Sequence, residues 1–377
     1  MSRVDDRWVR KDKTRTPLYG KGKRWQAVWT ENGTEKKQSF KAKDAALAHL
    51  TDIDHRQRSG TYTSSELGRV HVGELLDPWM ETLVHLEQST MAATRSDVRA
   101  TIRPYWAKKI VADITRADVQ QWVTEMDKAP RTVETIYGRF RNFLNWCVTE
   151  GRIKASPAAK INLPQGHKRE HIFLTVGQVQ DLTEAIGVFY EDLIWFLATT
   201  GLRFGEAAEL RVRDLDLPRR RITVSRSVTD VGGKMVVGPP KGRKSRSVPM
   251  TSFMVGRIAA RVKGKPRDAL VFPAQRGGWI RSNNFKRRTY DPAVKAAKLP
   301  ADLWVHDLRH TAASLAVASG ASVKSIQRML GHASAALTLD IYAGLFDQDL
   351  DAVADKMDSM LSLVPNPFLS ESSLKAG

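Results

Sequence analysis

The chain has 377 residues, which is long enough for two or three domains with a sizeable core. Lysine and arginine total 60 against 41 aspartates and glutamates, and the net charge of +19 favours a polyanionic partner, usually nucleic acid. A membrane surface is the competing reading. However, no apolar run approaches the length of a transmembrane helix, and the N-terminus lacks the apolar core of a signal peptide. The single cysteine, Cys147, fits a reducing cytoplasm, and no Cys/His cluster predicts a metal site.

Residues 1–65 are expected to form a small sheet backed by a helix. Apolar and polar residues alternate over 25–29, and Asn32-Gly33 predicts a hairpin turn. From Lys43 the apolar residues follow a helical period that ends before Gly60. The polar side chains of this sheet either bind a DNA groove or simply face solvent, and the sequence does not separate these alternatives for Arg24, Gln26 and Lys36.

Residues 70–163 are expected to be helical throughout. A helix in this region must end or kink near Pro104, because proline removes a backbone donor. Thr115 and Asp118 resemble a capping box, and Thr132 is expected to cap a longer helix. Exposed basic residues here are candidates for DNA phosphate contacts, although single surface cations are more often only solvated: Arg95 and Arg139.

Residues 164–172 are interpreted as a linker, since prolines flank the segment and charged residues dominate its end. A third domain is expected over 173–365, followed by a disordered tail over 366–377. The second helix expected in the 173–365 domain ends at Gly201. Arg203 follows it, and the planar guanidinium of this residue suits two phosphate oxygens. Glu206 either orients this arginine or is a routine acid at a helix N-terminus.

The segment 211–246 is strongly basic and has a β pattern with predicted turns. Lys241 is expected at the tip of a β-hairpin that can lie beside a DNA backbone. Burial and nearby arginines can lower a lysine pKa toward neutrality, which suits a general acid. Nonspecific phosphate binding is the preferred reading for the other cations of the turn, Arg243, Lys244 and Arg246. A helix predicted over 282–298 is also rich in basic residues, and Lys286 and Arg287 are candidates for DNA binding.

The segment from His306 to Tyr342 concentrates ionisable groups. His306, Arg309 and His310 begin a predicted helix, His332 follows a Leu-Gly pair, and Tyr342 lies ten residues further on. A tyrosine with a pKa near 10 is a poor nucleophile unless cationic donors neutralise the developing negative charge. Each residue taken singly has an ordinary structural explanation. The complete set at this spacing favours attack on a phosphodiester without a metal.

This pattern resembles the active-site signature of the tyrosine recombinases, the phage integrase family. That family uses an arginine, a lysine on a β-hairpin, a His-x-x-Arg pair, a further histidine and a tyrosine. One departure is that ten residues separate the last histidine from the tyrosine, where the common pattern has nine. The matching positions are Arg203 in TTGLRFGEAAEL, Lys241 in PPKGRKSRSVP, and His306, Arg309, His332 and Tyr342.

The resemblance implies a multidomain, mainly α fold with small antiparallel sheets. Residues 1–65 are similar to an arm-type DNA-binding domain, in which a helix backs a three-stranded sheet. Residues 70–163 resemble an all-α core-binding domain. Residues 173–365 resemble the mixed α+β catalytic domain, whose C-terminal helix packs in cis or docks onto a neighbouring protomer.

The resemblance also implies site-specific integration or excision of phage or mobile-element DNA in the bacterial cytoplasm, without a cofactor. Tyr342 would form a 3′-phosphotyrosyl link, while Lys241 protonates the leaving 5′ oxygen. His306 would assist proton movement, and the implied ligands of the nonbridging oxygens are Arg203, Arg309 and His332.

The implied partners are double-stranded DNA at core and arm-type sites, a homotetramer on that DNA, and room for an accessory DNA-bending or directionality protein. Two alternatives stay open. A type IB topoisomerase shares the chemistry but rotates one strand. A noncatalytic DNA-binding regulator is less favoured, because it needs neither Lys241 nor Tyr342.

Overall fold

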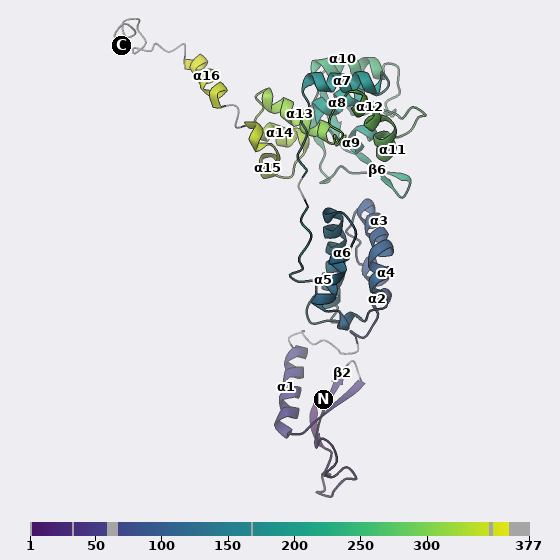
Figure 1. Cartoon of the computed structure of the whole chain (residues 1–377), viewed down its shortest axis with the longest axis vertical. Coiled ribbons are helices and arrows are strands. Elements are labelled where there is room, and N and C mark those ends of the chain that lie inside the picture. The colour runs from purple at the N-terminus through teal and green to yellow at the C-terminus, as the bar shows by residue number, and fades with distance from the viewer. Residues whose placement is uncertain (1, 32–33, 59–66, 167–168, 347–349, 362–377) are drawn as a thin grey trace, which may run out of the picture. The chain divides into compact units, whose positions relative to one another are not determined.

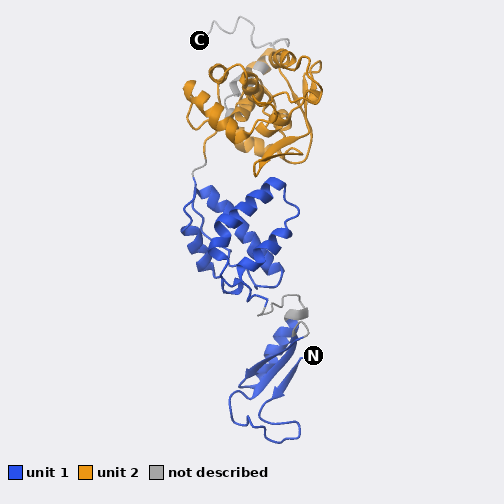
Figure 2. Ribbon diagram, turned by 90° about the vertical axis from the view of Figure 1, so that its right-hand side faces the viewer, with its two compact units in different colours: residues 1–168 blue, residues 169–377 orange. Residues whose placement is uncertain are grey.

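The computed structural model describes residues 2–31, 34–58, 67–166, 169–346 and 350–361. The chain divides into two compact units, residues 1–168 and 169–377 (Figures 1 and 2). The expectation of a mainly helical chain with small antiparallel sheets is confirmed. The predicted turn at Asn32-Gly33, the helix stop at Gly60 and the tail over 366–377 lie outside the described residues. Among the described helices, none is both long and apolar enough to cross a membrane.

The N-terminal part of the first unit is a three-stranded antiparallel sheet in the order β1-β2-β3, with one helix packed on it. Ala27 and Trp29 of the central strand are buried against Ala46, Leu50 and Ile53 of that helix, so the alternation seen in the sequence marks the buried face. The elements are β1 (Arg3–Asp6), β2 (Trp25–Glu31), β3 (Thr34–Phe40) and α1 (Lys43–Arg58).

Residues 67–166 form a helical bundle around packed aromatic rings. The ring centroids of Trp106 and Phe140, which are stacked, lie 4.6 Å apart. The helical segment does not end at Pro104. Instead the turn before it widens into a π-helix, which accommodates the missing proline donor. The elements are α2 (Val72–Glu81), α3 (Gln88–Asp97), η1 (Val98–Ile102), α4 (Arg103–Trp106), η2 (Val111–Asp113), α5 (Arg116–Thr124) and α6 (Pro130–Thr149).

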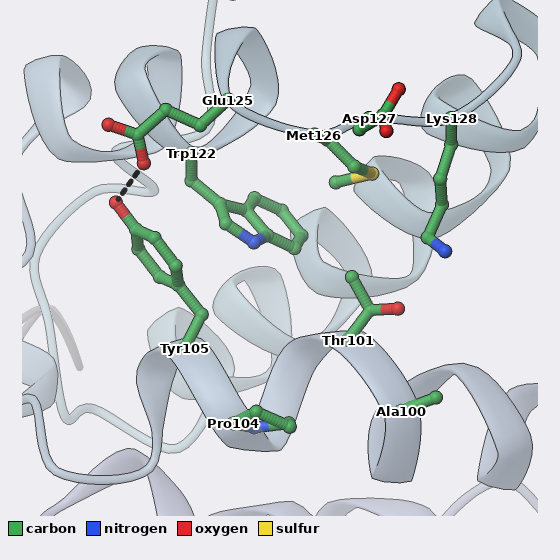
Figure 3. A pocket seen from close by; sticks show the side chains of 9 residues that line it. All are labelled: Ala100, Thr101, Pro104, Tyr105, Trp122, Glu125, Met126, Asp127 and Lys128. Carbon is green, nitrogen blue, oxygen red and sulfur yellow. Dashed lines mark hydrogen bonds between the residues drawn. The ribbon is translucent and has the colours of Figure 1, made fainter.

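The capping box of Thr115 and Asp118 at the start of α5 is confirmed. The cap predicted at Thr132 is wrong by two residues, because α6 begins at Pro130, whose fixed φ suits the first helical turn. Beside the π-turn lies a pocket of about 440 Å³, across which the Tyr105 hydroxyl is 3.5 Å from a Glu125 carboxylate oxygen (Figure 3).

The second unit places helices around two small sheets, and α8 and α13 pack against each other at its centre. One sheet has the antiparallel order β4-β5-β8, and the other is the hairpin β6-β7. The strands are β4 (Leu215–Asp216), β5 (Arg221–Val224), β6 (Ser227–Val231), β7 (Lys234–Gly238) and β8 (Arg246–Pro249). The helices before the last sheet strand are α7 (Val176–Ile186), α8 (Glu191–Thr200), α9 (Phe204–Glu209) and η3 (Val212–Asp214).

The helix predicted over 282–298 forms, with a π-helical turn in its middle and an end at Ala296. The later helices are α10 (Ser252–Val262), α11 (Ser282–Phe285), η4 (Lys286–Tyr290), α12 (Asp291–Ala296), α13 (Asp307–Ala318), α14 (Val323–Leu330), α15 (Ala335–Phe346) and α16 (Leu350–Leu361).

The position expected for Lys241 is wrong. The hairpin of this region is β6-β7, which turns at Gly232-Gly233, whereas Lys241 lies in the next turn, between β7 and β8. β8 pairs with β5 and not with β7. The reason is the Pro239-Pro240 pair, which offers no backbone donors and therefore ends the β7 ladder before the turn.

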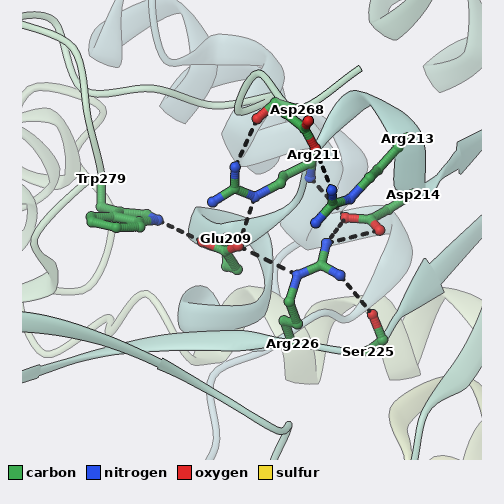
Figure 4. A network of polar contacts seen from close by, with 8 residues as sticks. All are labelled: Glu209, Arg211, Arg213, Asp214, Ser225, Arg226, Asp268 and Trp279. Carbon is green, nitrogen blue, oxygen red and sulfur yellow. Dashed lines mark hydrogen bonds and ion pairs between the residues drawn. The ribbon is translucent and has the colours of Figure 1, made fainter. Parts of the chain in front are cut away.

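A buried carboxylate ties the loops of this unit to α9 (Figure 4). Glu209, at the end of α9, is 1% exposed and accepts hydrogen bonds from Arg211 (2.8 Å) and Trp279 (2.6 Å). Arg226, after β5, bridges Glu209 at 3.4 Å and Asp214 at 2.6 Å. This network fixes the C-terminal end of α9, the helix that begins directly after Arg203.

Candidate active site

Two helix C-termini hold the guanidinium of Arg309. Its Nη1 donates to the carbonyl of Gly201 at 2.6 Å, and its Nη2 donates to the carbonyl of Leu330 at 2.7 Å. Gly201 caps α8 and Gly331 caps α14, both in the left-handed conformation. Carbonyls at helix C-termini attract a cation but carry no full charge, so Arg309 is fixed without being neutralised.

A single carboxylate, that of Glu206, orients two further arginines. Glu206 Oε1 accepts from Arg203 at 3.2 Å and from Arg246 at 2.9 Å, and its Oε2 accepts from Arg246 at 2.6 Å. The backbone N–H of Arg203 also donates to Oε2, at 2.9 Å. Glu206 is therefore both the acid of the first turn of α9 and the residue that orients Arg203, so its two predicted readings hold together.

The charges of this cluster are strongly coupled. Burial alone would raise the pKa of Glu206, but the hydrogen bonds and charge of Arg246, with those of Arg203, hold it below its usual value. Burial and the charges of Arg203 and Arg246 lower the pKa of Arg309, yet a guanidinium stays protonated at neutral pH. The result is a cationic site with one internal anion.

Two neutral histidines lie beside the arginines. Burial, followed by the charges of Arg309 and Arg203, lowers the pKa of His332 to about 4. The same causes lower the pKa of His306 to about 4, although this residue keeps contact with solvent. His332 Nδ1 is 3.0 Å from the buried Thr338 hydroxyl, and a hydrogen bond donated by that hydroxyl leaves the ring proton on Nε2. His332 can then donate to a phosphate oxygen.

Tyr342 lies in α15 and is 1% exposed. Its hydroxyl is 2.9 Å from Nδ1 of His310, and its ring lies parallel to that of His332 with the centroids 6.4 Å apart. Burial raises the pKa of Tyr342 to about 12, although the charge of Arg309 opposes the shift. The tyrosine is therefore protonated and shielded in this arrangement.

The structure brings together Arg203, Arg309, His306, His332 and Tyr342, as their contacts and mutual charge effects show. Lys241 stands apart in its exposed turn. Among the described residues, no hydrogen bond or ion pair joins it to the other five.

Three of the candidate DNA-binding cations are engaged in contacts within the protein, and the expectation that Arg139 is an exposed cation is wrong. The side chain of Arg246 is only 11% exposed and also donates to the Met329 carbonyl at 3.1 Å. Arg139 pairs with Asp97 and donates to a backbone carbonyl, and Arg24 pairs with Asp6 at 2.9 Å.

The remaining candidates lie at or near the surface. Gln26 donates to Ser39 at 3.3 Å, and Lys286 pairs with Asp291 at 2.8 Å. Lys36 lies in β3, the third strand of the N-terminal sheet. The exposed ones include Arg95, Arg243, Lys244 and Arg287.

Sequence reasoning missed the roles of Arg246 and His310. The position of each in its strand or helix repeat could have predicted which way its side chain faces. Arg246 is two residues before the buried Val248, so it lies on the inward face of β8. His310 is four residues after His306 and so lies on the same side of α13.

One group of potential metal ligands occurs among the described residues: His171, Asp307 and His310, whose ligand atoms lie within 4.8 Å of one another. However, the Asp307 carboxylate already binds both Nη atoms of Arg169, at 3.1 and 2.5 Å. The two imidazoles are stacked with centroids 4.0 Å apart, so they present ring faces to each other. This geometry suits packing better than chelation.

Comparisons with known proteins agree with this site. The sequence model described as "Phage integrase family" matches residues 173–349. The prophage phiRv2 integrase of Mycobacterium tuberculosis is 28% identical over 354 residues, covering 89% of this chain and 93% of the relative. Tyrosine recombinase XerC of Xanthomonas campestris pv. campestris (strain B100) is 30% identical over 280 residues, covering 71% of this chain and 81% of the relative.

The fold is similar to that of the Tn1549 transposon integrase, solved in complex with transposon right end DNA. That similarity has a TM-score of 0.66 at 19% identity and covers 76% of this chain and 100% of the solved chain. From the matched family region and the XerC relative, the chain belongs to the phage integrase family of tyrosine recombinases, enzymes that cleave and rejoin DNA strands.

Proposed function

We propose that this recombinase uses Tyr342 to exchange DNA strands at a specific site, integrating or excising phage or mobile-element DNA in the bacterial cytoplasm. The observation that carries this proposal is the convergence of Arg203, Arg309 and His332 beside the tyrosine that follows them in the chain. Relatives of this chain bear the names integrase and recombinase, which favours strand exchange over simple relaxation.

The proposed step is an in-line displacement at phosphorus. The Tyr342 oxygen attacks, the bond from phosphorus to the 5′ oxygen breaks, and a 3′-phosphotyrosyl ester forms. Arg203, Arg309 and His332 bind the nonbridging oxygens and stabilise the extra negative charge of the transition state. Because the two guanidiniums are held in place before DNA arrives, little reorganisation is needed when the charge develops.

Two proton transfers complete the step. The phenol loses its proton, with His306 assisting, and the leaving 5′ oxygen gains one from Lys241. The new ester retains the energy of the broken bond, so the 5′-hydroxyl of another strand can reverse the reaction and join a different partner. In this proposal the side chains of the chain carry out the chemistry without a cofactor.

The other parts of the chain are proposed to bind DNA around the crossover. Residues 70–163 would bind the core site, residues 1–65 a separate arm-type site, and residues 164–172 would link core binding to the catalytic domain over 173–365. Exchange between two duplexes requires four strand cuts, and one tyrosine per protomer therefore predicts a homotetramer. An accessory protein that bends DNA or sets the direction is compatible with a separate arm site.

The test of this proposal is covalent trapping. Nicked duplexes tiled across the DNA that flanks the gene would be incubated with the wild-type protein and resolved on a denaturing gel. One fragment should give a covalent adduct, and Tyr342→Phe should abolish it while leaving DNA affinity unchanged, because only the attacking oxygen is removed.

The matched control is Tyr290→Phe. Tyr290 is also buried in this unit, where its hydroxyl donates to the Trp304 carbonyl at 3.3 Å. This variant should still form the adduct. Equal adduct yields from Tyr342→Phe and the wild type would overturn the assignment of the nucleophile.

A further inference from the structure

A short extended segment covers the tyrosine pocket. Residues 169–174, here called the strap, run along α13, and every second side chain faces that helix. At one end Arg169 grips the Asp307 carboxylate, at 3.1 and 2.5 Å, and its guanidinium lies 5.1 Å from the Trp304 ring centroid. At the other end the Leu174 N–H donates to the Thr311 hydroxyl at 3.1 Å.

Between these two anchors the strap contacts the partner of the nucleophile. His171 stacks on His310 with the ring centroids 4.0 Å apart. Phe173 meets both His310 and Tyr342 edge-on, at 6.4 and 6.3 Å. Tyr342 is therefore buried, with its hydroxyl on His310 and its ring against Phe173 of the strap.

His310 acts in this pocket as a holder of the phenol and not as its base. Burial, together with the nearby imidazoles of His171 and His306, lowers the pKa of His310 to about 3, whereas burial raises that of Tyr342 to about 12. With the phenol protonated and the imidazole neutral, proton transfer between them is unfavourable in this closed arrangement. The imidazole can accept a hydrogen bond from the protonated phenol, which satisfies a hydroxyl that would otherwise be buried without a partner.

We propose that His310 is a positioning residue that holds Tyr342 in a closed resting place, that the strap shuts this place, and that cleavage begins only after the hydrogen bond between them opens. The inference rests on the proposed role of Tyr342 as the nucleophile. The strap is the first segment of the second unit, and it is anchored to α13 by Arg169.

The experiment is tyrosine nitration of the full-length protein without DNA, read residue by residue by mass spectrometry. In the wild type, Tyr342 should react far more slowly than Tyr105, which is 44% exposed. His310→Leu should speed the nitration of Tyr342 about tenfold, the effect of losing one hydrogen bond. His310→Asn, of similar size, keeps a polar group near the position of Nδ1 and should protect Tyr342 as the wild type does.

Two further measurements distinguish opening of the hydrogen bond between His310 and Tyr342 from unfolding of the whole unit. Tyr290, which is 0% exposed, should remain unreactive in every variant and so reports that the unit is folded. Arg169→Gln removes the anchor of the strap without touching the tyrosine pocket, and it should also speed nitration of Tyr342. If His310→Leu exposes Tyr290 as well, the result with Arg169→Gln decides the question.

The proposal fails if Tyr342 in the wild type reacts as fast as Tyr105, or if the Leu and Asn variants react alike. It also fails if Tyr342 stays protected in a folded Arg169→Gln variant. Because nitration requires neither DNA nor cleavage, a failure of the adduct experiment would leave this result intact, and the two proposals can be judged separately.

Discussion

The carboxylate of Glu206 shows how one residue organises several. It is 1% exposed and binds two guanidiniums that belong to different elements, Arg203 before α9 and Arg246 in β8. A buried carboxylate is stable only when such partners compensate the loss of water. The same contacts fix the orientation of Arg203, so stability and geometry depend on one side chain.

The buried histidines predict how stability depends on pH. The pKa of His310 is lowered from an ordinary 6.5 to about 3, and that of His332 to about 4. Between these values the unfolded chain binds protons that the folded chain does not, so stability rises with pH in this range. Above pH about 6.5 both histidines are neutral in the folded and in the unfolded chain. As the pH falls toward 4, protonation of the unfolded chain lowers the free energy of unfolding.

We therefore expect the free energy of unfolding to decrease as the pH falls from 7 to 4, and to decrease less steeply in His310→Asn. Urea unfolding at several pH values, followed through hydrogen exchange of α13 peptides, measures both slopes. Identical slopes in the wild type and the variant would show that His310 is not the group that titrates.

At the scale of elements, the site is built where helices end. The carbonyls of Gly201, which caps α8, and of Leu330, the last residue of α14, accept hydrogen bonds from Arg309, and the α14 cap Gly331 lies against Arg246. Its φ is +69°, and a Cβ added there would lie 2.8 Å from Cδ of Arg246. Both the backbone conformation and the neighbouring arginine therefore require glycine.

Gly331→Ala is expected to slow covalent adduct formation about a hundredfold, because a displaced Arg246 no longer holds Glu206 in place. Gly264→Ala is the matched control, since Gly264 has a φ of +74° but nothing within 4 Å of an added Cβ. Both variants should lose about 1–2 kcal/mol of stability from the left-handed conformation. Equal cleavage rates in the two variants would contradict the role assigned to the contact with Arg246.

The sequence predicts those features of the fold that depend on neighbouring residues. The capping box at Thr115 and the end of α8 at Gly201 follow from local hydrogen bonding and backbone freedom. The pairing of β8 with β5 does not, because a strand pattern carries no information about its partner. Similarly, Arg246 meets the carbonyl of Met329, 83 residues away, and only the folded chain shows that contact.

At the scale of the whole molecule, one proposed catalytic group is still out of place. Lys241 is exposed in the turn after β7, whereas the other five residues are already gathered. On the proposed mechanism, this turn has to reach the scissile phosphate on bound DNA before Lys241 can protonate the leaving oxygen. The net charge of +19 supplies the attraction, which salt will weaken.

If Lys241 is the acid, Lys241→Ala should slow cleavage of an ordinary nicked substrate about a hundredfold. A substrate with sulfur in place of the bridging 5′ oxygen should restore the rate, because a thiolate leaves without being protonated. Lys244→Ala, an exposed lysine of the same turn, should cleave both substrates normally. An equal defect of Lys241→Ala on both substrates would instead indicate a role in binding.

The packing of three guanidiniums near one carboxylate, which binds two of them, has a consequence for the protein before it meets DNA. Arg203, Arg246 and Arg309 gather around Glu206, so two positive charges are left unbalanced inside the fold. Their mutual repulsion is relieved only by an incoming anion, and a ligand that binds only the native state stabilises it by mass action. DNA binding is therefore expected to raise the free energy of unfolding of this unit, because a phosphate pairs with the charges that Glu206 leaves unbalanced.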